Sequence, residues 1–263
     1  AAYRRRHEPA RRRGVLALIM PHGLVSGSGV VFRQQLVAGT QARAERLGFD
    51  LAVLDDGPGL AERASTRPPR GFILACAGED PAWADGVVGD APAVWLEARG
   101  DPRWPGVVTD HFGDLTALLR RAASRGYRRP GLLMPDWVAE GPGADYRAAF
   151  TLHAGAEAPV QLLATADDPL RLGAWVREHR LDLVVHAGTD WPSKRLREQG
   201  VAVPGACGLA ALDLVRGEGP VSGLVQGRDR LAAHAVDLLA SALAGGRHES
   251  AGETAPTLLL AAR

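Results

Sequence analysis

Short apolar runs alternate with amphipathic segments along almost the whole chain, and this alternation limits the possible folds most strongly. The first run, GVLALIM at residues 14–20, is continuous and apolar, which is typical of a strand buried on both faces. Between Val30 and Leu47, apolar residues recur about every four positions, which predicts an amphipathic helix. FDLAVLDD at 49–56 predicts the next strand. These segments therefore form a strand–helix–strand unit with a right-handed connection.

The same alternation continues to the end of the chain. Further strands are predicted at residues 71–76, 92–98, 107–110, 130–135, 159–165, 181–187, 200–214, 222–226 and 257–262. Further helices are predicted at residues 115–123, 146–152, 170–179, 193–199 and 228–244. Strands and helices that take turns predict parallel sheets covered on both faces. Because about eleven strands exceed what one twisted open sheet holds, we expect an α/β fold with two doubly wound, parallel-sheet lobes.

Cysteine and histidine usage argues against a metal site. The 2 Cys exclude a disulfide framework and a four-cysteine zinc site, and the 8 His form no HxxxH or HExxH pair.

No apolar run approaches the roughly 20 residues of a membrane-spanning helix, and the start lacks the apolar stretch of a secretory signal. We therefore expect a cytoplasmic protein with no metal and no membrane partner.

Motifs for catalysis or nucleotide binding are incomplete. Gly27-Ser28-Gly29 resembles the start of the dinucleotide motif G-x-G-x-x-G, but Phe32 stands at the third glycine position, where a large side chain obstructs close helix–sheet packing. The nucleophile elbow G-x-S-x-G is absent. We assign no catalytic residue and no cofactor, and expect a protein that is not an enzyme.

The charge is distributed unevenly. Residues 1–13 hold six Arg against one Glu, whereas the other 250 residues hold 25 Lys and Arg against 29 Asp and Glu. Such a basic arm either contacts phosphates or is a solvated tail. Because the first residue is Ala and not Met, we expect that a segment of the protein precedes it.

Polar and aromatic residues follow directly after many predicted strands. In open parallel sheets, ligands bind at the carboxyl ends of the strands. A cleft between two lobes would gather these groups, with Trp137 and Trp191 stacking on an apolar sugar face and Asp or His binding hydroxyls. The residues after strands include His22, Asp56, Glu79, Asp110, His111, Asp136, Trp137, His186, Asp190, Trp191 and Asp213. They predict a site for a small polar ligand.

The order of the motifs resembles the effector-binding core of the LacI/GalR family of transcription regulators. The stretches that carry the resemblance are RGVLALIMP, FRQQLVAGTQARAERLGFDLAVLD, RPPRGFILA, VVTDHFGDLTALLRRAASRGYRRPGLLMP, REQGVAVPGACGLAALD, GPVSGLVQ and RLAAHAVDLLASALAGG. The resemblance implies a periplasmic-binding-protein-like fold of type I with three crossover segments. It also implies a homodimer, a small-molecule effector (a sugar or related metabolite), and repressor-type binding of operator DNA through an N-terminal helix-turn-helix that is missing from this chain.

The resemblance also implies lobe boundaries. The N-terminal lobe would be residues 14–125 plus 227–247, and the C-terminal lobe residues 126–223 plus 254–263. Residues 1–13 would be the remnant of a linker to the DNA-reading domain. Crossings would fall near Arg125, Gln226 and Glu253.

Family positions transfer to only part of the expected ligand site. Asp110 matches an acidic residue after a strand, Asp213 the first Asp of a G-F-D-D run (here Ala-Leu-Asp-Leu), and Gln226 a Gln at a crossing. Phe32 and the helix residue Tyr146 complete the expected ligand-binding set. The Arg that usually anchors a sugar falls on Pro142, and Ala187, Gly188 and Thr189 stand where the family has Asn-Asp. These departures argue against a common hexose effector.

Two other functions remain open at this point. A solute-binding protein of a transporter would share the same fold, although the expected lack of a signal peptide and the basic arm argue against it. An enzyme of the doubly wound class would use the partial glycine motif.

Overall fold

A computed structural model shows a chain divided into two compact units. Unit 1 comprises Ala1–Val108 and Arg228–Ala255, and unit 2 comprises Thr109–Gly227 and Pro256–Arg263. The chain therefore passes from one unit to the other three times. The residues that the structure describes are 13–22, 28–75, 84–97, 104–135, 143–163, 171–187, 191–214, 222–245, 253–255 and 258–260.

Unit 1 is built on a six-stranded sheet in the order β11-β5-β4-β3-β1-β2. Its strands are β1 (Val15–Met20), β2 (Asp50–Asp55), β3 (Gly71–Ala75), β4 (Ala93–Leu96), β5 (Gly106–Thr109) and β11 (Glu253–Ala255). Its helices are α1 (Ser28–Arg46), α2 (Leu60–Thr66), α3 (Asp85–Val88) and α9 (Arg228–Leu243). The central strand β1 pairs in parallel with both β2 and β3. All six of its residues are buried, as its uninterrupted apolar sequence predicts.

Unit 2 repeats this arrangement with the strand order β12-β10-β9-β8-β6-β7. Its strands are β6 (Pro130–Pro135), β7 (Val160–Leu163), β8 (Leu183–His186), β9 (Gly208–Ala211), β10 (Ser222–Val225) and β12 (Leu258–Leu260). Its helices are α4 (His111–Ser124), α6 (Gly143–Ala154), α7 (Leu172–Glu178) and α8 (Trp191–Glu198). β6 pairs in parallel with β7 and β8, whereas β12 is antiparallel to β10.

The shared strand order fixes where each sheet offers a ligand site. In each unit the first five strands run in the order 2-1-3-4-5, so the direction of winding reverses between β1 and β3 and between β6 and β8. Open sheets of this topology bind ligands outside the carboxyl ends of their strands at that reversal point. The residues that follow these strands are therefore the candidates for a ligand site.

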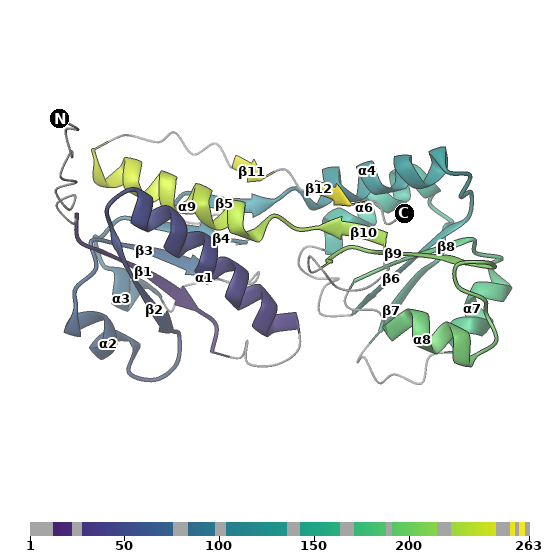
Figure 1. Ribbon diagram of the computed structural model, residues 1–263, viewed down its shortest axis with the longest axis horizontal. Helices are drawn as coiled ribbons and strands as arrows, with labels where there is room; N and C mark the ends of the chain where they lie inside the picture. Colours follow the sequence, from purple (N-terminus) through teal and green to yellow (C-terminus); the bar gives the residue numbers. More distant parts are fainter. Residues whose placement is uncertain are drawn as a thin grey trace, which may run out of the picture. The chain divides into compact units, whose positions relative to one another are not determined.

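Helices cover both faces of the sheet in unit 1. α1 and α9 lie side by side on one face, where Leu36 and Leu239 join strand residues such as Leu16 and Ile73 in one apolar cluster (Figure 1). On the other face, α2 and α3 contribute to a second cluster around Trp95. Burial on both faces explains why most strands here read as continuous apolar runs.

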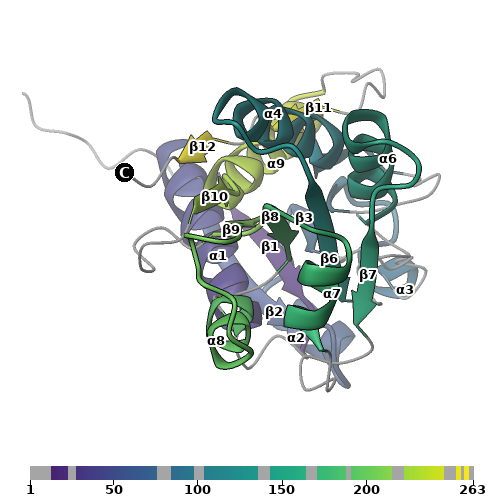
Figure 2. The ribbon, with the colours of Figure 1, turned by 90° about the vertical axis from the view of Figure 1, so that its right-hand side faces the viewer.

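Unit 2 is layered in the same way. α4 and α6 cover one face through a cluster that includes Leu115 and Phe150, and α7 and α8 cover the other through a cluster that includes Trp175 and Leu196 (Figure 2). β7 forms one edge of this sheet.

The structure confirms the α/β class with two doubly wound sheets, but it adds elements and moves one boundary. α2, α3 and β11 were not predicted from the sequence. The first passage between units lies at Val108 and Thr109 and not near Arg125, because α4 packs against α6 and β10 of unit 2. Among the described residues, no helix combines the length and the apolar character that crossing a membrane requires.

The contact between α1 and α9 depends on a glycine. A Cβ atom added to Gly39 would lie 2.5 Å from the backbone carbonyl oxygen of Asp229 and 2.6 Å from its Cα. Only a residue without a side chain permits two helix backbones to approach this closely. Beyond this point, Arg43 Nε donates to Asp237 Oδ1 at 2.6 Å and links the same two helices.

We predict that Gly39→Ala destabilises the protein by about 2 kcal/mol, because the new methyl group pushes α9 away from the core. The measurement is denaturant unfolding followed by circular dichroism. Gly86→Ala is the matched control, since none of the described atoms lies within 4 Å of its added Cβ. A helical Gly→Ala change in open space is neutral or stabilising by about 0.5 kcal/mol. Equal unfolding midpoints for both variants would contradict the prediction.

Candidate functional site

In unit 1, two predicted site residues meet at the carboxyl ends of neighbouring strands. His22 lies two residues after β1 and Asp56 directly follows β2. Asp56 Oδ1 accepts from the backbone N–H of His22 at 2.9 Å and lies 2.7 Å from its Nδ1. The His22 side chain is 73% exposed and that of Asp56 is 20% exposed. The contact therefore holds an accessible imidazole beside a partly buried carboxylate.

α1 adds an ion pair to this edge of unit 1. Arg33 Nη1 donates to Asp55 Oδ1 at 2.6 Å, and Asp55 is the last residue of β2. Sequence reasoning did not select Arg33. Its position one turn into the helix that follows β1 was the only available signal.

Phe32 lies on α1, and its ring contacts Arg228, the first residue of α9. The Arg228 guanidinium carbon is 4.9 Å from the centre of the Phe32 ring, and its Nη1 donates to Gln35 Oε1 at 3.2 Å. Arg228 is only 7% exposed. A cation over an aromatic face is stabilising, more so when it is shielded from water. Phe32 is thus occupied by a protein cation, and Arg228 is a second residue that sequence reasoning missed.

Asp110, which directly follows β5, has a structural role in unit 2. It is the N-cap of α4, and its Oδ1 accepts from the backbone N–H of Gly113 at 2.8 Å. An N-cap carboxylate accepts a hydrogen bond from an otherwise unpaired backbone N–H of the first turn, and its negative charge is attracted to the positive end of the helix dipole.

Three predicted residues form a connected polar chain in unit 2. Tyr146 is 3% exposed and His111 is 9% exposed, and the Tyr146 hydroxyl lies 2.8 Å from His111 Nδ1. Gln226 Nε2 donates to the same hydroxyl at 3.2 Å and to the carbonyl oxygen of Leu212 at 3.3 Å. Because a hydroxyl can donate one hydrogen bond and accept two, Tyr146 contacts Gln226 and His111 at once, and the tautomer of His111 sets the direction of the second bond. This chain joins α4, α6 and the segment after β10.

The remaining predicted residues of unit 2 are less closely connected. Asp213 is half-buried two residues after β9, next to the Leu212 carbonyl that Gln226 contacts. Trp191 begins α8 and packs, half-buried, against the apolar cluster on that face of the sheet. Asp136, Trp137 and Asp190 lie outside the described residues.

His186, at the carboxyl end of β8, is buried and does not present its ring to solvent. It is 0% exposed, and it alternates along the strand with Val185, so it shares the face of Val184 and the α7–α8 cluster. Neither ring nitrogen has a well-aligned hydrogen-bond partner in the part of the chain that the structure describes. Burial lowers the pKa of His186 to about 4, and the backbone of Ala187 offsets only part of this effect.

The site chemistry suits binding through hydrogen bonds. Within the described ranges, no group of three or more His, Cys, Asp or Glu is arranged to hold a metal ion. Burial raises the pKa of the Cys207 thiol to about 11, so this sulfur stays protonated and unreactive near neutral pH. The carboxylates, imidazoles, hydroxyl and amide described above are hydrogen-bond donors and acceptors.

We predict that Tyr146→Phe destabilises the protein by about 1 to 2 kcal/mol, because it removes the hydroxyl that His111 and Gln226 share. Urea unfolding measures the effect. Tyr127→Phe is the matched control, since the Tyr127 hydroxyl has no hydrogen bond with any residue that the structure describes. If the two variants unfold at the same urea concentration, the shared hydroxyl contributes no net stability.

We predict an acid-sensitive contribution from His186. Its folded-state pKa lies below that of the unfolded chain, so the unfolded state binds a proton first as pH falls below 6.5. The contribution is therefore present at neutral pH, and about 3 kcal/mol of stability is lost by pH 4. Comparing the free energy of unfolding of the native chain and His186→Leu between pH 7 and pH 4 isolates this term. His153→Gln, an exposed histidine, is the control; a parallel pH dependence in the native chain and His186→Leu would contradict the prediction.

Solved structures of known proteins share this architecture. No family model matches the sequence, and no curated protein is a detectable relative by sequence. A LacI transcriptional regulator from Lactobacillus brevis superposes with a TM-score of 0.75 at 16% identity, over 94% of this chain and 100% of that one.

Two similar structures contain a bound sugar. The regulator CelR in complex with cellobiose has a TM-score of 0.72 at 21% identity, over 97% of this chain and 85% of that one. A LacI-family regulator from Enterococcus faecium with bound ribose has a TM-score of 0.70 at 14% identity, over 94% and 97%. The chain therefore has the two-unit, periplasmic-binding-protein-like α/β fold of LacI-family transcriptional regulators.

Proposed function

We propose that this chain is the effector-binding and dimerisation core of a LacI-type, DNA-binding transcription regulator. In this proposal a small polar metabolite binds at the carboxyl ends of the parallel strands and changes the affinity of a homodimer for operator DNA. A helix-turn-helix domain preceding the core reads the DNA, in the cytoplasm. We assign no reaction to the chain.

The observation that carries the proposal is the fold match over nearly the whole length of both chains, combined with polar side chains at the strand ends. The L. brevis regulator is covered completely, so the match is not limited to one sheet. Fold alone does not define function. The His111–Tyr146–Gln226 chain is the second support, because placing polar groups in an apolar core costs desolvation free energy that their mutual hydrogen bonds offset.

The residues present favour a ligand with several hydroxyl groups. In unit 2, Asp213 offers carboxylate oxygens and Gln226 an amide. Such groups bind hydroxyls through directed hydrogen bonds, which give specificity. Pro142 provides no charged anchor of the kind an arginine would supply, so we propose a sugar-related metabolite other than a common hexose.

Effector binding would act through a population shift. A ligand that binds one conformation of the core more tightly favours that conformation, and a dimer converts the change into a different spacing of two DNA-reading heads. Coupling is reciprocal, so operator DNA alters effector affinity by the same factor.

The first test identifies a ligand by thermal shift with a panel of monosaccharides, disaccharides and nucleosides. We expect at least one to raise the melting temperature, because a ligand that binds only the folded state stabilises it. Asp213→Asn should weaken its binding about tenfold or more, since charged hydrogen bonds contribute roughly 1.5 to 3 kcal/mol. Asp90→Asn, an exposed carboxylate before β4, is the control and should bind normally. Asp110 is a poor probe because its loss removes the cap of α4.

The second test measures operator affinity of the encoded polypeptide that contains this chain, with and without that ligand. We expect a change of about 5- to 150-fold. A ligand that binds tightly yet leaves DNA affinity unchanged would reject the gating mechanism while leaving the binding site intact.

A further inference from the structure

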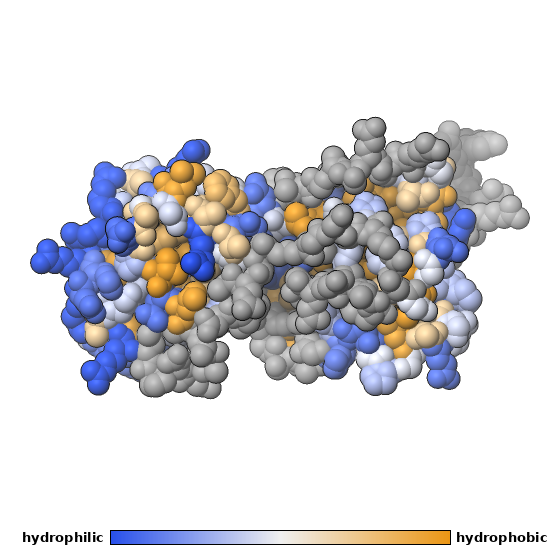
Figure 3. Space-filling model, turned by 180° about the vertical axis from the view of Figure 1, so that it is seen from behind, coloured by the Kyte–Doolittle hydropathy of each residue, from blue (hydrophilic) through white to orange (hydrophobic). Residues whose placement is uncertain are grey.

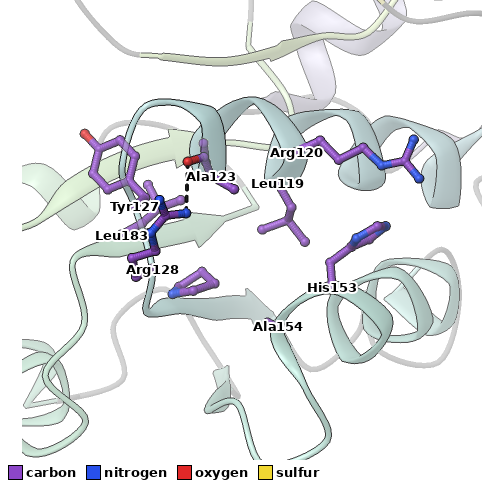
Figure 4. Close-up of a pocket in the computed structure, with 10 residues that line it drawn as sticks. Leu119, Arg120, Ala123, Tyr127, Arg128, His153, Ala154 and Leu183 are labelled. Atoms are coloured by element: carbon purple, nitrogen blue, oxygen red, sulfur yellow. Dashed lines mark hydrogen bonds between the residues drawn. The ribbon is translucent and has the colours of Figure 1, made fainter.

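A groove lies in unit 2 between the carboxyl-terminal turns of α4 and α6. Leu119 and Leu183 line it with apolar surface, and Arg120, Arg128, His153 and Tyr127 complete most of its wall (Figure 4). Its volume is about 280 Å³. Leu183 is the first residue of β8, so the groove lies at the amino edge of the sheet. The proposed effector groups follow the carboxyl ends of the strands, so the groove is a separate site.

The groove combines an apolar floor with a basic rim. Leu119 and Leu183 are 6% and 3% exposed, whereas Arg120, Arg128 and His153 are exposed. In Figure 4, Arg120 and His153 lie on opposite sides of one end, and Arg128 lies toward the other end beside Tyr127. Arg128 Nη1 donates to the carbonyl oxygen of Ala123 at 3.2 Å, which holds the guanidinium at the rim and leaves its other donors for a ligand.

The segment beside the groove carries more positive charge than is needed to balance the negative end of the α4 dipole. The ten residues 120–129 contain five Arg and no acidic residue, and within the described ranges none of these Arg forms a salt bridge. The carboxyl end of a helix carries only about half a negative charge. The nearby carboxylate of Asp182 accepts from the backbone N–H groups of Arg128 and Arg129 at 2.7 and 2.9 Å. A space-filling view shows hydrophilic side chains surrounding apolar ones on unit 2, at the left of the image (Figure 3).

We propose that the groove between α4 and α6 binds a small organic anion with an apolar body, such as an aryl phosphate. The apolar body would lie on Leu119 and Leu183, and the anionic group would bind Arg120 at the end of the groove where His153 also lies. One guanidinium group can donate two parallel hydrogen bonds to two oxygens of a phosphate or carboxylate, which makes the contact strong and fixes its orientation. The volume is close to the lower end of small-molecule sites and suits one compact molecule.

Isothermal titration calorimetry with three probes tests both halves of this chemistry. Phenyl phosphate carries the apolar body and the anion, inorganic phosphate only the anion, and phenol only the apolar body. We expect phenyl phosphate to bind about tenfold or more tightly than either of the others. Equal binding of phenyl phosphate and inorganic phosphate, or no binding of phenyl phosphate, would overturn the proposal.

Two neighbouring arginines provide a matched pair of variants. Arg120→Gln removes a rim group, whereas Arg121→Gln removes the same charge from an exposed position on the same helix that does not line the groove. We expect Arg120→Gln to weaken phenyl phosphate binding about tenfold and Arg121→Gln to change it less than about twofold. Equal losses would show that only the general positive potential attracts the anion, and would overturn the assignment. Unchanged melting temperatures verify that both variants are folded, and normal effector binding by both separates this site from the proposed effector site.

Discussion

Parallel strand pairing is the constraint on which the rest of this structure depends. A parallel partner is reached only through a crossover, so helices cover both faces of each sheet and the carboxyl ends of the parallel strands lie at the same edge. In unit 1 this requires β1 to be apolar along its whole length, because it pairs on both sides and is covered on both faces. The same constraint explains why His22 and Asp56, 34 residues apart, come into hydrogen-bond contact.

Sequence periodicity was sufficient to predict the elements that bury much apolar surface. The strands from β1 to β10, the helix α1 and the helix α9 follow patterns that burial imposes. Short elements carry too little of that signal: α2 buries only Leu60 and Ala64, and β11 reads Glu-Thr-Ala. The assignment of α4 to unit 2 could not be predicted either, because its apolar face is equally compatible with either sheet until its contacts with α6 are known.

The sequence indicated which residues follow the strands, but not which of them contact one another. Strand ends indicated Asp110, His111 and Asp213, yet nothing local indicates that Gln226 bonds to Tyr146, 80 residues away. Long-range partners of this kind depend on the packing of α6 against α4. The cap formed by Asp110 was also missed, because the helix was predicted to begin at residue 115 and Asp110 was assigned to the ligand site.

Neither unit is one continuous stretch of chain, and this affects how the protein is made. The apolar cluster beneath α1 is completed by Leu231, Ala235 and Leu239 of α9, which leave the ribosome only after most of unit 2. Domains generally fold as units during synthesis. The core of unit 1 therefore stays incomplete while the strands β6 to β10 of unit 2 are synthesised. Until α9 is synthesised, part of the apolar face of the amino-terminal sheet has no helix to cover it.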